Sequence, residues 1–235
     1  MKDFSFSDAI ISYIVFLYST VVHEAAHAWS AWRLGDDTAY RGGQVTLDPT
    51  PHIRREPIGM VAVPLLSLFL GGWVIGWASA PYDPLWERRY PARSALMALA
   101  GPASNIVLML LAAFAIRAGI SAGGFTAPSS ITWSQITSPV TGGGMWAFAA
   151  TLASIVFSQN LLLAAFNLFP VPPLDGRCLP LFFLRGRVAG AYLDFVQQPA
   201  LMWLGLFLSW KLFGVVYPPL RLAAVNLLYP GLNYG

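Results

Sequence analysis

Long apolar runs constrain the fold of this chain more than any other feature of its sequence. Five of them lie at about residues 9–32, 57–78, 94–118, 145–169 and 198–217. A transmembrane helix needs about 20 predominantly apolar residues, which runs of this length supply. Only 11% of the residues are charged, whereas about a quarter of the residues in a soluble domain carry a charge. The sequence therefore predicts an all-α polytopic membrane protein, with residues 1–235 forming a single membrane-embedded domain.

The second apolar run is interrupted, and this affects how many runs cross the membrane. Pro64, Gly71 and Gly72 all disfavour a continuous helix there. If all five runs spanned the membrane, the 14 Lys and Arg residues would divide seven to seven between its two sides. If residues 57–78 instead enter and return, the division is ten to four, which the positive-inside rule favours. We therefore expect about four full transmembrane helices plus a re-entrant segment.

Two polar stretches carry further structural signals. The letters GGQVTLD, residues 42–48, alternate apolar and polar residues after two glycines, which predicts a short β-strand. Residues 119–144 are rich in Gly, Ser, Thr and Pro and contain no charged residue, which is typical of a loop. With a re-entrant second run, Arg54 and Arg88 lie on the cytoplasmic side and residues 119–144 on the opposite side.

Three ionisable side chains interrupt the first apolar run, in the letters TVVHEAAHAW at residues 20–29. His23, Glu24 and His27 fit the pattern H-E-x-x-H, in which positions i and i+4 place both imidazoles on one helix face. Two such rings can bind one Zn²⁺ at about 2.0–2.1 Å, with the glutamate placed to act as a general base. The alternative is a pair of histidines bonded to neighbouring helices. Three polar groups at bilayer depth without a metal are costly, so a zinc site is favoured.

A catalytic zinc site usually has three protein ligands, and the third has to come from elsewhere in the chain. His52 is the only other histidine, and it lies in a charged stretch that favours a surface or interfacial role. Asp175 follows the letters FPVPP, whose prolines prevent the preceding helix from continuing. A Leu-Asp-Gly turn after them can direct the carboxylate back among the helices. Residue type alone leaves Asp175 equally consistent with capping the next short helix.

Three motifs, taken in order, resemble those of the site-2 protease family of intramembrane zinc metalloproteases. They are HEAAH at residues 23–27, AGPASN at 100–105 and NLFPVPPLDG at 167–176. The letters GGQVTLDPTPHIRREPIG and GWASAPYDP further resemble the small bacterial branch of that family, which lacks PDZ and CBS domains. The resemblance implies one Zn²⁺ per chain, held by His23, His27 and Asp175. It also implies Glu24 as the catalytic acid and base, and Asn167 as a substrate-binding residue.

Other positions in these motifs have less specific interpretations. Gly101 and Asn105 have the residue types that let helices pack closely and bond across the contact. The letters GWASAP, residues 76–81, resemble a family segment near the active site, so we expect short β-strands there. An edge strand at that place can pair with an unwound substrate. The single cysteine, Cys178, excludes an internal disulfide.

The resemblance also implies a function. The chain would be an intramembrane zinc metalloendopeptidase in the inner membrane of a bacterial cell, with its active site toward the cytoplasmic side. Its partners would be the lipid bilayer and transmembrane proteins or peptides, cleaved in or near their membrane segments. A net charge of +3 without a basic patch among aromatic residues gives no reason to expect nucleic acid. The alternative is a zinc-binding membrane scaffold or transporter, which would use the same ligands without needing Glu24 as a base.

Overall fold

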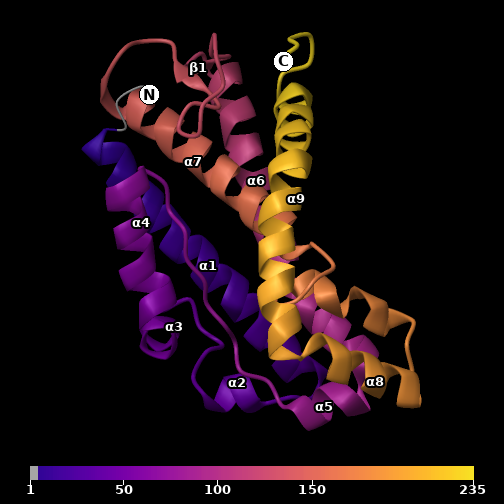
Figure 1. Ribbon diagram of the computed structural model, residues 1–235. Coiled ribbons are helices and arrows are strands. Elements are labelled where there is room, and N and C mark those ends of the chain that lie inside the picture. Colours follow the sequence, from indigo (N-terminus) through magenta and orange to yellow (C-terminus); the bar gives the residue numbers. More distant parts are fainter. Residues whose placement is uncertain (1–4) are drawn as a thin grey trace.

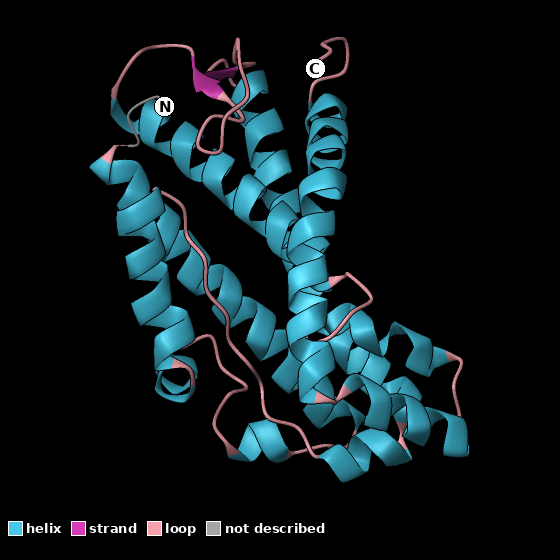
Figure 2. Cartoon of the chain, viewed as in Figure 1, coloured by secondary structure: helices cyan, strands magenta, loops and turns pink. Residues whose placement is uncertain are grey.

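The computed structural model describes residues 5–235 and is mostly helical (Figures 1 and 2). Among these residues, four helices are long and apolar enough to cross a membrane: α1 Phe6–Leu34, α6 Pro91–Ser121, α7 Gly144–Asn167 and α9 Pro199–Leu228. The shorter helical elements are α2 Thr38–Arg41, α3 Pro49–Arg55, the π-helix η1 Ile58–Ala62, α4 Val63–Gly71, α5 Pro84–Arg89, the 3₁₀-helix η2 Asp175–Phe182 and α8 Gly186–Val196. The prediction of an all-α polytopic membrane protein is confirmed.

Helix α1 is bounded by capping residues at both ends. The Ser5 hydroxyl accepts a hydrogen bond from the backbone N–H of Asp8 at 3.1 Å. Gly35 ends the helix with φ at 104°, a left-handed conformation that glycine adopts without strain. The Arg93 guanidinium then donates to the carbonyl of Leu34 at 3.0 Å. These caps define where α1 begins and ends, and the HEAAH motif lies within this long apolar helix.

The second apolar run forms a short helix, Ile58–Gly71, that does not reach across a membrane. At roughly 1.5 Å per residue it extends only about 20 Å, whereas the hydrocarbon core is about 30 Å thick. Gly72, with φ at 71°, ends α4, and residues 73–83 continue without regular secondary structure. Figure 1 shows this segment returning along α4 and α1 to α5, so α3 and α5 lie at the same end of the molecule. The run is re-entrant, as predicted.

The strand predicted in GGQVTLD is wrong. Residues 45–47 form bends, and Asp48 is the N-cap of α3, where its carboxylate accepts from the N–H of Thr50 at 2.9 Å. The alternation of residue types therefore reflects a turn that leads into a helix cap. His52, expected at the surface, is only 2% exposed. Its Nε2 bonds to the carbonyl of Thr46 at 3.1 Å, which holds the bend over α3.

The short strands expected near the active site are also absent from that place. Among residues 5–235 the strands are β1 Phe125–Thr126 and β2 Ser138–Pro139, which pair antiparallel. Figure 1 places β1 at the opposite end of the molecule from α2, α3 and α5. The letters GWASAP form an extended segment whose Trp77 N–H donates to the carbonyl of Gly59 at 3.1 Å. Its neighbour is the π-helix η1 rather than another strand, so no strand pairing develops.

The two largest of three apolar core clusters lie toward opposite ends of the helical bundle. The outer cluster joins the loop at residues 122–143 to α6, α7 and α9, and comprises Ala112, Ile116, Ile136, Phe157, Leu161, Val225, Leu228 and Tyr229. In it the Tyr229 hydroxyl donates to the carbonyl of Ile136 at 2.8 Å. The inner cluster packs α6 against η2 and α8, and comprises Ala95, Ala98, Cys178, Leu181, Ala189 and Leu193. Helix α6 contributes to both clusters and contacts α1 and α7.

Candidate metal centre

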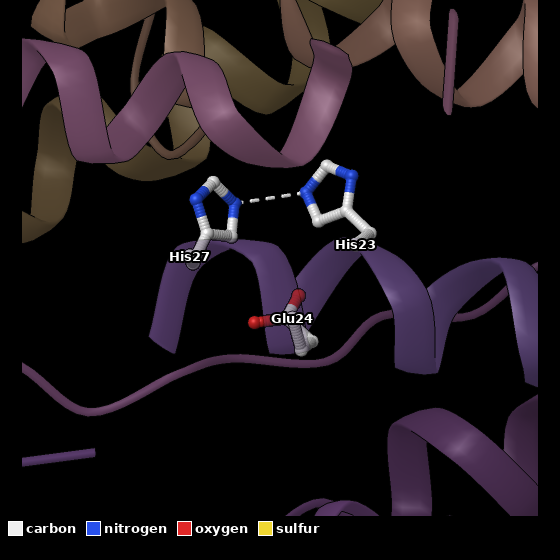
Figure 3. A group of neighbouring side chains, drawn as sticks. All are labelled: His23, Glu24 and His27. Atoms are coloured by element: carbon white, nitrogen blue, oxygen red, sulfur yellow. Dashed lines mark hydrogen bonds between the residues drawn. The ribbon is translucent and has the colours of Figure 1, made fainter. Parts of the chain in front are cut away.

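The two histidines of HEAAH point from α1 toward α6 (Figure 3). Both are buried, with exposed fractions of 6% for His23 and 7% for His27. Their rings meet edge to face at 82°, and their Nε2 atoms lie 3.0 Å apart. The i, i+4 spacing therefore brings two ring nitrogens to one point, as the sequence predicted.

Asp175, the first residue of η2, reaches the same point from a distant part of the chain. Its Oδ2 lies 3.1 Å from His23 Nε2 and 3.3 Å from His27 Nε2. Gly176 permits this approach, since a Cβ there would lie 2.3 Å from the carbonyl oxygen of Leu168. The proline-rich turn can thus fold back tightly onto the end of α7. The structure brings all three expected ligands together, and their role as ligands stays a prediction.

The outer nitrogen of each ring has its own partner. His27 Nδ1 lies 2.8 Å from the carbonyl oxygen of Met97, and His23 Nδ1 lies 2.6 Å from Oδ1 of Asn105. A carbonyl oxygen only accepts, so His27 carries its proton on Nδ1 and presents a lone pair at Nε2. Hydrogen-bonding the outer nitrogen in this way is the usual arrangement for histidines that bind a metal.

The residues present fit a zinc ion. Two imidazole nitrogens and a carboxylate oxygen converge, which is a ligand set that Zn²⁺ takes in hydrolases. Gly101 keeps the space beside them open: a Cβ at that position would lie 2.3 Å from His27 Nε2 and 2.5 Å from His23 Nε2. The sequence indicated Gly101 only as a packing residue. Its position shows that α6 approaches the two rings so closely that any side chain would fill the centre.

Glu24 lies beside this centre with a free carboxylate. Figure 3 shows it on the flank of α1 next to the two rings, and one of its oxygens is within 4.8 Å of both histidine nitrogens. Glu24 is 5% exposed, and within residues 5–235 its Oε2 has no hydrogen-bond partner. It faces a cleft of about 220 Å³ that His27, Asp175 and residues 78–82 also line. An unpaired carboxylate in such a cleft is suited to take up a proton.

The inner part of the cleft is lined by polar residues with structural partners. The Arg177 guanidinium donates to the hydroxyl of Tyr82 at 3.0 Å, which ties the extended segment to η2. Glu87 is fully buried and accepts from Ser94 at 3.1 Å. Burial raises the pKa of the Cys178 thiol to about 12. Since the thiolate is the nucleophile and the metal ligand, Cys178 stays a buried apolar residue at neutral pH.

No hydrogen bond within residues 5–235 connects Asn167 to the metal centre. Its amide donates to the carbonyl of Leu163, one turn back in α7, at 3.0 Å. It does not line the 220 Å³ cleft. The substrate-binding role of Asn167 therefore stays a prediction.

One group of buried polar residues at the site was not predicted from the sequence. Asn160 and Ser19 form a buried hydrogen-bonded group with Asn105, which was indicated only as a packing residue. The sequence did contain an indication of this group. Asn160 is a primary amide inside a long apolar run, and polar side chains within a membrane-spanning helix usually have a functional or structural partner. The sequence alone does not indicate that the partner of Asn160 is Asn105 on the neighbouring helix α6.

Comparisons with known proteins add to this geometry. The family described as "Peptidase family M50" matches residues 11–212. "Putative zinc metalloprotease YwhC" of Bacillus subtilis is 31% identical over 69% of this chain, and the match spans 64% of the relative, just under two thirds. "Putative zinc metalloprotease Rip2" of Mycobacterium tuberculosis is 32% identical over 89% of this chain and 73% of its own length. No solved structure matches the chain.

Proposed function

Because the chain belongs to peptidase family M50, the site-2 protease family, we propose that it is an intramembrane zinc metalloendopeptidase. The family and the names of the relatives support a zinc metalloprotease. The proposal adds the substrate, which is a peptide bond in or near a transmembrane segment of another membrane protein. One observation carries it: His23 and His27, on a helix long and apolar enough to span a membrane, meet Asp175 within 3.3 Å.

In this proposal His23, His27 and Asp175 hold one Zn²⁺ per chain. When bound there, Zn²⁺ supplies Lewis acidity, which polarises a carbonyl oxygen and favours the ionisation of water. Glu24 takes the proton of the attacking water and passes it to the leaving amine. Its buried, unpartnered Oε2 supports this role, since no neighbouring hydrogen-bond donor occupies the oxygen that would accept the proton.

The extended segment at residues 73–83 is the proposed place of substrate contact. A peptide in a helix has its carbonyls bonded along the helix, so it has to unwind before attack. Ala78 and Ala80 line the cleft, and no backbone–backbone hydrogen bond involves them within residues 5–235. An extended substrate can pair with these free groups by strand addition. Asn167 is assigned to the same substrate, after its amide leaves the Leu163 carbonyl.

The proposed location is the inner membrane of a bacterial cell, with the metal centre toward the cytoplasmic side. Helices α3 and α5, which lie at one end of the molecule (Figure 1), end in Arg54, Arg55, Arg88 and Arg89. The positive-inside rule favours the cytoplasm for such an end. The partners in this proposal are the lipid bilayer and membrane-spanning substrates.

Replacing Glu24 tests the proposal. Glu24→Gln keeps the size of the side chain but removes the base, so zinc content should persist. Cleavage of a transmembrane test substrate in liposomes should fall by about 10²–10⁴-fold, the usual contribution of general-base catalysis. The appearance of fragments is measured for both proteins, with zinc quantified in each. Asp37→Asn is the control, because Asp37 is an exposed carboxylate paired with Arg41, and it should cleave as the parent does.

Two outcomes would contradict the proposal. Equal cleavage by parent and Glu24→Gln would remove Glu24 from the mechanism. A zinc-loaded parent that cleaves no transmembrane substrate would favour the zinc-binding scaffold or transporter.

A further inference from the structure

A chain of buried hydrogen bonds connects His23 to two neighbouring helices. Asn105 Oδ1, on α6, lies 2.6 Å from His23 Nδ1. The amide nitrogen of Asn105 donates to Oδ1 of Asn160, on α7, at 2.9 Å. The amide nitrogen of Asn160 then donates to the hydroxyl of Ser19, on α1, at 3.0 Å. Asn105 and Asn160 are both 0% exposed, so water does not compete for these bonds.

Two backbone carbonyls determine the direction in which these hydrogen bonds run. The amide nitrogen of Asn160 also lies 2.9 Å from the carbonyl oxygen of Val156, and that of Asn105 lies 3.4 Å from the carbonyl oxygen of Ser19. A backbone carbonyl can only accept, so the NH₂ group of each amide has to face it. The oxygen of Asn160 therefore faces Asn105, and the oxygen of Asn105 faces His23.

From this order we infer that Asn160 is a positioning residue that, through Asn105, keeps the proton of His23 on Nδ1. An oxygen facing Nδ1 requires Nδ1 to donate, which leaves the lone pair of a neutral ring on Nε2. Nε2 is the atom that lies 3.0 Å from His27 Nε2 and 3.1 Å from Asp175. Asn160 thus sets the state of the metal centre without touching it.

Reversing the direction of these hydrogen bonds would prevent His23 from binding a metal through Nε2. If the amide of Asn105 turned over, its NH₂ group would face Nδ1, and the proton of a neutral His23 would move to Nε2. An Nε2–H has no lone pair for a metal. The turned amide would also place its oxygen against the oxygens of Asn160 and Ser19, leaving buried acceptors unpaired. With Asn160 in place, the reversed arrangement is therefore disfavoured.

The two histidines differ in this respect. His27 is fixed directly by the backbone carbonyl of Met97, which no side-chain substitution removes. His23 depends on two side chains in succession, so a change at Asn160 should affect His23 and leave His27 as it is. This asymmetry is specific to the inference, because a general loosening of the bundle would affect both rings.

The inference rests on the proposed function only in taking Nε2 as the metal-binding atom. The tautomer itself is measured without zinc or substrate, by NMR of ¹⁵N-histidine-labelled protein in detergent, at a pH at which the ¹⁵N shifts themselves show the rings to be neutral. The chain has 3 histidines, so His52→Gln assigns one signal and leaves two to be compared. The parent should show His23 and His27 with protons on Nδ1. A parent His23 protonated on Nε2 overturns the inference, and this outcome needs no variant.

Substitution of Asn160 is the second test of the inference. Asn160→Leu removes the acceptor that orients Asn105, so His23 should become a mixture of tautomers while His27 stays unchanged. Zinc affinity, measured by competition with a chelator, should fall by about 10–100-fold, as when other residues that orient metal ligands are lost. Asn160→Asp retains an oxygen that accepts from Asn105 and should keep the parent tautomer. A purely structural role would be disturbed by both substitutions.

A neighbouring amide provides the matched control. Gln159 precedes Asn160 on α7 and is 1% exposed, and its Oε1 has no hydrogen-bond partner within residues 5–235. Gln159→Leu therefore removes a buried amide from the same turn without touching the chain to His23, and its tautomers and zinc affinity should match the parent. If Asn160→Leu keeps the parent tautomer and zinc affinity, or if Gln159→Leu changes them as much, the inference is overturned. A parent that shows the expected tautomers but cleaves no transmembrane substrate would instead count against the proposed function alone.

Discussion

The cleft at the metal centre has two walls that are held in place by different means. The helical wall, formed by α1, α6 and η2, carries His27 and Asp175. The outer nitrogens of His27 and of the neighbouring His23 are bonded to α6 at 2.8 and 2.6 Å. The opposite wall, residues 78–82, is extended and half-buried. It is attached mainly through side chains: the Ser79 hydroxyl donates to Glu56 at 2.6 Å, and Tyr82 accepts from Arg177.

This difference suits the two walls to different roles. Groups that hold a metal need fixed positions, and buried bonds to a packed helix provide them. A wall that receives a peptide needs free backbone groups, and an extended segment held by side chains keeps them available. Substitutions in the helical wall should therefore affect zinc binding and turnover, whereas those in the extended wall should affect substrate affinity.

The largest effect is expected for Asp175→Ala in the helical wall. It removes one of three converging ligand groups, so zinc affinity should fall by more than the roughly 10–100-fold that follows loss of a residue supporting a ligand. Proteolysis should fall to background. Zinc per chain after dialysis, together with fragment formation, measures both. Unchanged zinc affinity would show that the three-ligand set is wrong.

Gly101→Ala should have the next largest effect. Its Cβ would lie 2.3 Å from His27 Nε2, and neither ring can move without breaking its bond to α6. Zinc affinity should fall, with about 1–3 kcal/mol lost from the free energy of unfolding through overpacking. Gly190→Ala is the control, because a Cβ there meets no atom nearer than the Arg88 guanidinium at 3.8 Å. Parent-like zinc affinity in Gly101→Ala would mean that the helical wall is less rigid than its bonds indicate.

Ser79→Ala should have a smaller effect, of another kind. It removes a hydrogen bond to the Glu56 carboxylate that holds the extended wall, and bonds to charged groups contribute about 1.5–3 kcal/mol. KM should rise, by about tenfold at the lower end of this range, while zinc content and kcat stay near the parent values. Steady-state kinetics with a transmembrane substrate separate the two quantities. A fall in kcat with KM unchanged would remove the distinction between the walls.

The smallest effect is expected for Asp194→Asn, outside both walls. Asp194 pairs with Arg88 at the surface between α8 and α5, and this guanidinium lowers the pKa of the Asp194 carboxyl. Such a pair adds stability at neutral pH, and the gain is lost as the pH falls and the carboxylate is protonated. Thermal unfolding should thus differ slightly from the parent at neutral pH and not in acid, with catalysis unchanged. A change in KM or zinc content would mean that α8 influences the cleft.

The helical wall was also the more predictable from sequence. The i, i+4 spacing of His23 and His27 fixes their common face whatever the helix packs against, and three prolines before Asp175 force a turn. The strand in GGQVTLD was mispredicted because a helix cap at Asp48 overrode the alternating pattern. Gly101 was assigned only to packing and Asn160 was not singled out, since their roles depend on how closely helices approach, which no local pattern encodes. The extended wall shows this most clearly, because its partners are the C-terminal end of α3 and η2 rather than a strand.

The outer core has a consequence for how the chain is assembled in a membrane. Ile136 lies in the loop between α6 and α7, whereas Tyr229 follows α9. The hydroxyl of Tyr229 donates to the carbonyl of Ile136. In the proposed topology this loop crosses the bilayer, and because folding during synthesis proceeds from the N-terminus, it does so well before its partner has been made. The lack of charged residues at positions 119–144 suits such a crossing. Insertion of α9 is then the event that closes the outer half of the protein, so a ribosome that stops before Tyr229 leaves that half without its final contact.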